Sequence, residues 1–269
     1  MKNIIYLIVI LISISNCYSQ TAETYFDRGD NKFEQKDYKG AIVNFTEAIE
    51  LKPDFAEAYY NRGRAKGNLQ DYKGAIVDFT KAIELNPNYE LAYRGRGVAK
   101  GELQDHKGAV ADYTKAIEIK PDYAGAYYNR GFAKDNLQDY KGAIADYTKT
   151  IQLDPDDVET YYYRGLAKYK QQDYKGAIAD YTKTIELKPD YWRAYFDRGF
   201  TKRNLQDHKG AIADYTQAIN INPEYASAYY LRGLAKLDLG QKESGCLDLY
   251  KAGELGEFEA YNLIRKYCN

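Results

Sequence analysis

Six prolines stand at one fixed interval along this 269-residue chain, and the chain contains no others. Proline ends a helix because it lacks a backbone N–H and clashes with the preceding turn. A fold with a single core has no need of a helix stop that returns at a constant spacing. The interval therefore predicts an array of repeated helical units. The prolines are Pro53, Pro87, Pro121, Pro155, Pro189 and Pro223.

Three further columns of identical residues recur at the same interval from Ala22 onward. A tyrosine column comprises Tyr25, Tyr59, Tyr93, Tyr127, Tyr161, Tyr195 and Tyr229. A glycine column comprises Gly29, Gly63, Gly97, Gly131, Gly165, Gly199 and Gly233. An alanine column comprises Ala41, Ala75, Ala109, Ala143, Ala177 and Ala211, with Gly245 in the last copy. We expect repeats at 22–55, 56–89, 90–123, 124–157, 158–191 and 192–225, a degenerate repeat at 226–256 and a C-terminal capping helix within 257–269.

Each repeat has the apolar spacing of two helices joined by a short turn. In the second copy the first helix carries Tyr59 and Gly63, and the second carries Ala75, Phe79, Ala82 and Ile83 at helical spacing. Asp71 is suited to N-cap the second helix, and Asn88 to N-cap the first helix of the next copy. One such pair cannot bury its own apolar face, so the copies are expected to stack.

The spacing of seven residues in the second copy resembles the tetratricopeptide repeat. They are Tyr59, Gly63, Tyr72, Ala75, Phe79, Ala82 and Pro87, and the resemblance covers about residues 22 to 256. It implies an all-α, right-handed α-solenoid of antiparallel helix pairs, in which the first helix of each pair lines a concave groove. It also implies a scaffold that binds a peptide or a partner protein.

Two basic columns depart from the usual family pattern. Both columns lie on the first helices. The arginine column comprises Arg28, Arg62, Arg96, Arg130, Arg164, Arg198 and Arg232, and the lysine column comprises Lys32, Lys66, Lys100, Lys134, Lys168, Lys202 and Lys236. An aspartate column on the second helices (Asp78, Asp112, Asp146, Asp180, Asp214, Asp248) matches them, with Asn44 in the first copy. We predict a ladder of ion pairs, such as Arg62 with Asp78 and Arg130 with Asp146. A basic stripe that binds an acidic ligand is the alternative.

If the family geometry holds, the groove face of the first helices varies from copy to copy. The expected partner-binding residues are Tyr60, Arg64, Arg94, Tyr128, Phe132, Tyr162, Leu166, Tyr169, Phe196 and Phe200. Exposed aromatic rings with flanking cations are typical of a binding hot spot. The alternative is that some of these rings only pack between adjacent first helices.

The N-terminal segment 1–19 is typical of a secretory signal peptide. An apolar run from Ile4 to Ile14 follows Lys2, and cleavage is expected between Ser19 and Gln20. The run is too short to span a bilayer, so no membrane span is expected in the mature chain. An alternative is acylation of Cys17 as a lipid anchor. We expect export to the periplasm, the outer envelope or the medium.

The cysteines outside this segment are Cys246 and Cys268. In an oxidising compartment they are a candidate disulfide, and the alternative is two buried small apolar residues. His106 and His208 occupy a slot that is tyrosine in four other copies, so we expect neither a metal site nor a catalytic base.

The glycines are spread singly, which excludes a phosphate-binding loop and leaves no cofactor predicted. A net charge of −1 gives no basic field for nucleic acid. The sequence thus predicts a non-enzymatic scaffold of the cell envelope or extracellular space with a protein or peptide partner. A carbohydrate-binding module and a structural spacer are the alternatives.

Overall fold

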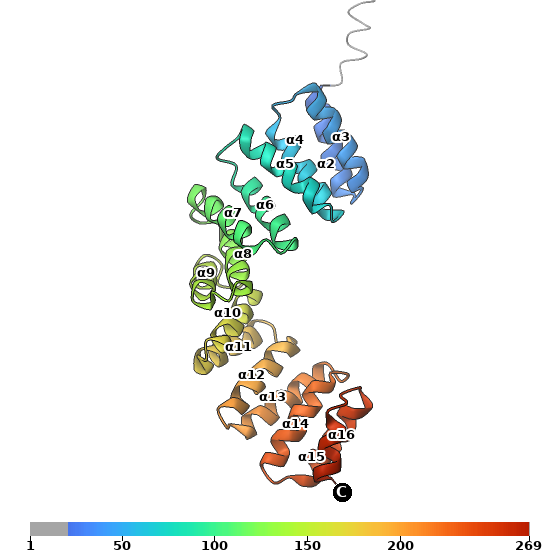
Figure 1. Cartoon of the computed structure of the whole chain (residues 1–269), viewed down its shortest axis with the longest axis vertical. Coiled ribbons are helices and arrows are strands. Elements are labelled where there is room, and N and C mark those ends of the chain that lie inside the picture. The colour runs from blue at the N-terminus through green and yellow to red at the C-terminus, as the bar shows by residue number, and fades with distance from the viewer. Residues whose placement is uncertain (1–20, 269) are drawn as a thin grey trace, which may run out of the picture. The chain divides into compact units, whose positions relative to one another are not determined.

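The computed structural model describes residues 21–268, and every regular element in that range is a helix (Figure 1). The expected signal peptide, with its cleavage site at Ser19 and Gln20 and with Cys17, lies outside the described residues. No helix within the described range is long and apolar enough to span a membrane.

The helices form successive pairs that are joined by turns of a few residues. The pairs are α2 (Ala22–Glu34) with α3 (Tyr38–Leu51), α4 (Ala56–Asn68) with α5 (Tyr72–Leu85), α6 (Glu90–Glu102) with α7 (His106–Ile119), α8 (Ala124–Asn136) with α9 (Tyr140–Leu153), α10 (Val158–Lys170) with α11 (Tyr174–Leu187), α12 (Trp192–Asn204) with α13 (His208–Ile221), and α14 (Ala226–Asp238) with α15 (Lys242–Glu254). A last helix, α16 (Ala260–Tyr267), follows alone.

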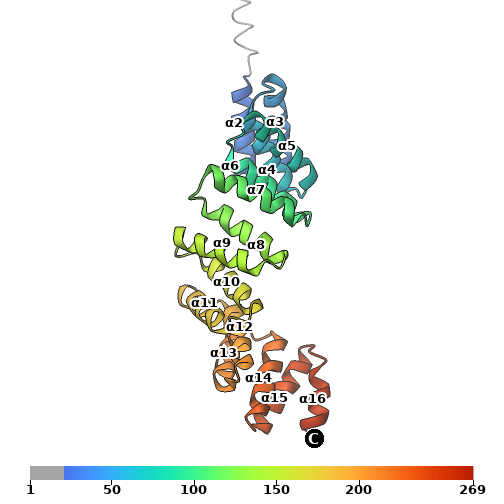
Figure 2. The same cartoon turned by 60° about the vertical axis from the view of Figure 1, so that its left-hand side comes forward.

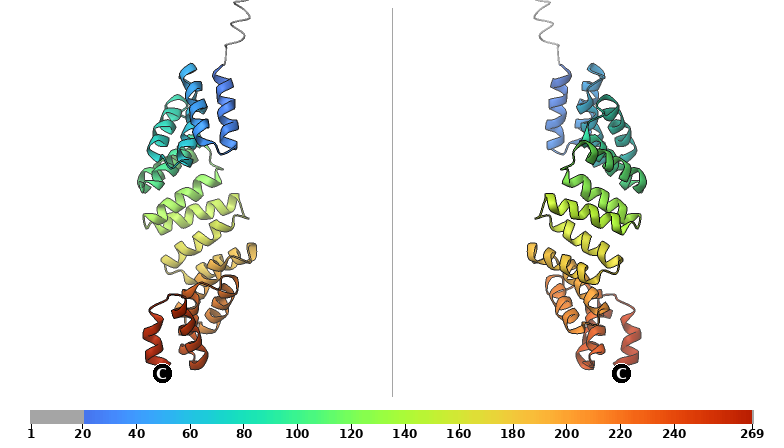
Figure 3. Two further views of the ribbon diagram at one scale, coloured as in Figure 1. Left: turned by 90° about the vertical axis from the view of Figure 1, so that its right-hand side faces the viewer. Right: turned by 90° about the vertical axis from the view of Figure 1, so that its left-hand side faces the viewer.

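The chain divides into two compact units, one up to Ala126 and one from Tyr127 onward. In the first unit, α3 packs on its partner α2 and also on the next first helix α4, and α5 packs in the same way on α4 and α6 (Figure 2). The second unit repeats this arrangement through α9, α10, α11, α12, α13, α14 and α15, and α16 packs on α15 (Figure 3). The second helices α3 and α5 of the first unit, and α11 and α13 of the second unit, are therefore each shared between two first helices.

A recurring turn geometry starts most of the second helices. The side chain of Asp71 accepts a hydrogen bond from the backbone N–H of Gly74 at 3.0 Å and caps α5. The residue before it, Gln70, has a left-handed φ of 63°. The same cap is formed by Asp37, Asp105, Asp139, Asp173 and Asp207.

The predicted cap at Asn88 is wrong. Helix α6 follows Tyr89, which makes no side-chain cap, and the N–H of Asn88 instead donates to the side chain of Asn86. The turn after Pro87 is closed by the backbone, because the N–H of Tyr89 donates to the carbonyl of Asn86. The N–H groups of Ala92 and Tyr93 then donate to the carbonyl of Tyr89 in the first turn of α6.

The core consists of small residues that face buried rings. Ala75 is completely buried, and a Cβ added at Gly63 would lie 2.9 Å from the ring of Phe79. A larger residue at the glycine would collide with this ring, because protein interiors are close-packed. The buried rings at this position in successive repeats are Phe45, Phe79, Tyr113, Tyr147, Tyr181 and Tyr215.

An ion-pair ladder joins the two helices of a pair. Arg62 donates from Nε and NH2 to the two carboxylate oxygens of Asp78 at 3.0 and 2.7 Å. Arg130 holds Asp146 in the same bidentate way, at 2.9 and 2.7 Å. Corresponding pairs are Arg96–Asp112, Arg164–Asp180, Arg198–Asp214 and Arg232–Asp248.

Two further groups complete the ladder, and the sequence did not predict their roles. Lys66 Nζ lies 2.7 Å from Asp78 Oδ2, so one buried carboxylate binds two cations. Arg62 NH1 also donates to Thr46 Oγ1, on the second helix of the preceding pair, at 3.1 Å. The arginine thus connects its own helix pair to the one before it.

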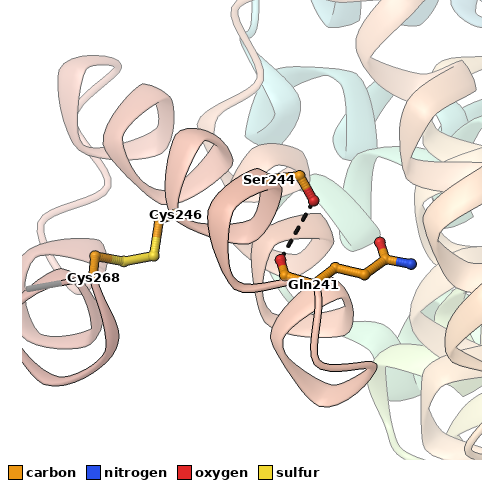
Figure 4. Close-up of a disulfide and its surroundings, with 4 residues drawn as sticks. All are labelled: Gln241, Ser244, Cys246 and Cys268. Carbon is orange, nitrogen blue, oxygen red and sulfur yellow. Dashed lines mark hydrogen bonds between the residues drawn. A yellow bond between two sulfur atoms is a disulfide. The ribbon is translucent and has the colours of Figure 1, made fainter.

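The end of the second unit is closed by α16 and a disulfide. Cys246 in α15 is bonded to Cys268, which directly follows α16 (Figure 4). Ala260 and Ile264 of α16 pack against Leu249 in a buried cluster. Helix α16 occupies only part of the expected segment 257–269, because 257–259 form a turn after Gly256, whose φ is 97°.

Replacing Asp146 by alanine is expected to lower the free energy of unfolding by about 3 kcal/mol, because two partly buried cations lose their carboxylate. Urea denaturation followed by circular dichroism measures the change. Asp156→Ala, at an exposed aspartate in the next turn, should change stability by less than about 0.5 kcal/mol. Equal stability of the two variants would contradict a structural role for the ladder.

Removing the disulfide by the double change Cys246→Ala and Cys268→Ala is expected to loosen α16. The bond joins residues 22 positions apart, and a closed loop of this size contributes about 3 kcal/mol. Amide hydrogen exchange in α16 should speed up while exchange in α10–α13 stays unchanged. Unchanged exchange in α16 would show that packing alone holds the helix.

Candidate functional site

A pocket of about 380 Å³ opens on the first helices of the first unit. Phe33 of α2, Tyr60 and Arg64 of α4, and Arg94 of α6 contribute to its walls. The remaining lining residues are Gly63, Gly67, Asn68, Tyr72, Phe79, Leu91, Gly95, Val98, Ala99 and Glu102. The pocket thus combines aromatic walls with two guanidinium groups, and it brings together Tyr60, Arg64 and Arg94 from the expected groove set.

The pocket exists because small residues replace large ones at this place in the repeat. Gly67 occupies the slot that holds Tyr169 in a later repeat, and an added Cβ at Gly67 would meet nothing within 4 Å. Tyr169 packs on Phe200 at 5.7 Å between ring centroids and accepts a hydrogen bond from Asn204. The slots of Phe200 and Asn204 correspond to Val98 and Glu102, which line the pocket.

Arg64 is anchored at one side of the pocket. Its guanidinium lies 4.4 Å from the ring centroid of Phe33, and NH1 donates to Asn61 Oδ1 at 3.1 Å. Asn61 in turn donates to Asp30 at 2.8 Å. Burial raises the pKa of Asp30, and the charge of Arg64 opposes this shift. Arg64 is therefore preorganised by stacking and by a neighbouring carboxylate.

Arg94 has a different environment. It replaces the aromatic residue that the other six repeats carry at the same slot, namely Phe26, Tyr60, Tyr128, Tyr162, Phe196 and Tyr230. Its guanidinium lies 5.8 Å from the ring centroid of Tyr123. Its Nε is buried and has no hydrogen-bond partner among the described residues.

Several rings of the expected groove set pack inside the second unit. Tyr162 is only 8% exposed and donates from its hydroxyl to Asp197 at 2.8 Å. Phe196 packs against Tyr215 and Tyr225. The expectation of an open aromatic surface is wrong for Tyr162, because the following repeat covers it.

The rest of the set is partly covered. Tyr128, Leu166, Tyr169 and Phe200 are partly buried. Phe132 is 44% exposed and makes an edge contact with Tyr163 at 5.7 Å. Phe132 is the one exposed ring of the expected set among the residues that the structure describes.

Sequence reasoning missed Asp197, a partly buried carboxyl in the second unit. Burial raises its pKa to about 6, and the hydrogen bond from Tyr162 and the charge of Arg193 oppose the shift. The one signal in the sequence is a column of unlike residues, where Asp197 aligns with Asn61, Gly95, Asn129 and Tyr163. No group of three or more His, Cys, Asp or Glu residues in the described range is suited to hold a metal ion.

Asp197→Asn is expected to remove one contribution to the pH dependence of stability. The carboxyl binds its proton more tightly in the folded chain than in the unfolded one. Its contribution to the stability of the fold is therefore complete below about pH 4 and is lost as the pH rises through about 6. The difference in free energy of unfolding between the variant and the wild type should therefore shift by about 2 kcal/mol in favour of the variant from pH 4 to pH 8. Denaturant unfolding at the two pH values measures this difference, and a pH-independent difference would contradict the assignment.

Structures of other proteins show the same fold. The C-terminal part of a TPR repeat-containing protein from Cytophaga hutchinsonii aligns with a TM-score of 0.76 at 19% identity, over 88% of this chain and 98% of that chain. YrrB, described as a TPR protein with an unusual peptide-binding site, aligns with a TM-score of 0.62 at 23% identity, over 68% and 95% of the two chains. MamA from Desulfovibrio magneticus RS-1 aligns with a TM-score of 0.61 at 25% identity, over 64% and 98%.

The family is evident from the sequence itself, although no curated protein matches the chain. A family model described as TPR repeat matches residues 29–70, 102–135, 136–172 and 202–240. A second model, described as tetratricopeptide repeat, matches residues 56–89 and 158–191. These matches cover more than half of the sequence and agree with the helix pairs of the structure. The chain therefore belongs to the tetratricopeptide repeat family.

Proposed function

We propose that this protein is a non-enzymatic scaffold that binds a peptide segment of a partner protein on its first helices. The pocket formed by α2, α4, α5 and α6 carries the proposal. Concave sites with mostly apolar walls and a few placed polar groups are typical of ligand binding. YrrB, which shares the fold, has a peptide-binding site.

The chemistry of the pocket favours a peptide over a sugar. Carbohydrate binding requires an open aromatic face, yet Tyr60 is partly buried and packs on Phe79 and Tyr89 at centroid distances of 5.8 and 4.9 Å. Arginine and aromatic side chains instead contribute much of the binding energy at protein–protein interfaces. A carbohydrate-binding module is the second candidate, and the exposed ring of Phe132 is the observation in its favour.

The proposed location is the cell envelope or the extracellular space. The segment 1–19 has the pattern of an export signal, with acylation of Cys17 as the alternative to simple cleavage. The disulfide between Cys246 and Cys268 supports this location, since such bonds persist in oxidising compartments.

Filling the pocket should abolish peptide binding without unfolding the protein. Gly67→Tyr introduces the residue that a later repeat carries at this slot, and Gly67 has open space around its Cβ position. A displayed library of random peptides should yield binders to the wild type that bind Gly67→Tyr at least about ten-fold more weakly. The affinities are measured by fluorescence polarisation with labelled synthetic peptides.

Gly67→Ala is the matched control. It removes the same glycine, keeps the pocket open and improves helix propensity by up to about 1 kcal/mol, so it should bind the selected peptides like the wild type. A library that yields no binders, together with saturable binding of an oligosaccharide, would replace the peptide proposal by the carbohydrate one.

A further inference from the structure

We propose that α16 is an interface between two copies of this chain, in which the two α16 helices pair antiparallel about a two-fold axis. The interface lies within the second unit and is independent of the proposed function. Exposed rings, a neighbouring pocket and the order of charges along the segment 257–267 point to this pairing.

Two large rings stand at the ends of α16 on the side away from the core. Ala260 and Ile264 are buried against α15, whereas Phe258, in the turn before α16, is 77% exposed. Tyr267, the last residue of the helix, is 39% exposed. Exposed apolar residues that are scattered singly need no explanation, but here two of them flank one helix face.

The face between these rings is a free helix surface. Its residues follow the i, i+3, i+4, i+7 spacing and are Glu259, Asn262, Leu263 and Lys266. Leu263 is half-buried, and the others are exposed. Glu259 already has helical dihedral angles, with φ −62° and ψ −26°, so it extends the face by one position.

Charges of opposite sign lie at the two ends of this face. Lys266 Nζ lies over the ring of Tyr267 at 4.9 Å, and neither Lys266 nor Glu259 forms an ion pair with another described residue. The two residues are seven positions apart, about 10 Å along the helix axis, so they do not pair with each other within one chain. An ion pair for either of them therefore requires a second molecule.

An antiparallel second copy supplies both partners at once. A two-fold axis midway between Asn262 and Leu263 places Glu259 opposite Lys266 of the second copy, and symmetry repeats the contact. The same axis places Phe258 opposite Tyr267 of the second copy, because 258 and 267 are equally far from the axis. A parallel pairing would bring like charges together, which is unfavourable.

A pocket next to Tyr267 offers space for the ring of Phe258 from the second copy. The pocket has a volume of about 460 Å³, and Leu234 and Leu237 of α14 are in its walls with Lys266 and Tyr267. Its other lining residues are Asp238, Gly240 and Lys242. Insertion of the ring would remove exposed apolar surface from water. Because α16 does not line the pocket of the first unit, the dimer would present that pocket twice.

Sedimentation equilibrium of the mature protein at micromolar concentrations tests the association. The wild type should show a reversible equilibrium between monomer and dimer. Phe258→Ala should raise the dissociation constant of the dimer at least about ten-fold, because each dimer loses two buried rings. Circular dichroism and an intact bond between Cys246 and Cys268 check that the variant is folded.

Charge reversals test the antiparallel register. Glu259→Lys and Lys266→Glu alone should each raise the dissociation constant about ten-fold at low salt, because two attractive pairs per dimer become repulsive. The double variant re-forms both pairs with exchanged signs and should return to within about three-fold of the wild type. Asp156→Lys, at an exposed aspartate in the turn before α10, is the matched control and should leave the dissociation constant unchanged.

A monomer at every concentration would overturn the inference. A dimer that Phe258→Ala does not weaken would also overturn it, since the contact would then lie on another surface. Single reversals that the double variant fails to rescue would exclude the antiparallel pairing. None of these results bears on peptide binding, which Gly67→Tyr tests separately.

Discussion

One buried carboxylate in each repeat from the second to the seventh fixes how the two helices of a pair lie against one another. Asp78 accepts hydrogen bonds from Arg62 and contacts Lys66, both on the first helix of its pair. Because Arg62 also donates to Thr46 of the preceding pair, a single guanidinium sets two helix contacts at once. Such a buried network is stable only when every member has a partner, and the arginine, lysine and aspartate columns recur together from the second repeat to the seventh.

The ladder does not involve the slot of Tyr60 on the first helices. In most repeats a ring at the slot of Tyr60 packs on the buried ring of its own pair, as Tyr162 does on Tyr181 in the second unit. In the third repeat Arg94 replaces this ring, and in the second repeat Gly67 leaves the adjoining space open. The pocket is the result of these local departures, which the ladder tolerates because it does not use those residues.

The repeat period made most of the fold predictable, since one contact pattern recurs at the constant interval that the prolines mark. The pairing of Arg130 with Asp146 followed from matching columns, but the participation of Lys134 did not, because column matching does not show which cation reaches a carboxylate. The sequence also did not predict which aromatic rings are exposed and which are buried. Tyr162 is covered by its interaction with Asp197, and that interaction depends on residues that differ between repeats.

Hydrogen exchange on the protein with and without a selected peptide tests most directly whether departures from the repeat create the binding site. Binding at the pocket should slow amide exchange in α4 and α6, the helices that carry Arg64 and Arg94. Exchange in α12 and α14 should stay unchanged, since the slot of Arg94 holds the rings of Phe196 and Tyr230 on these helices. Protection confined to α10, α12 and α14 would contradict this account. It would show instead that the peptide binds to the aromatic residues of the second unit.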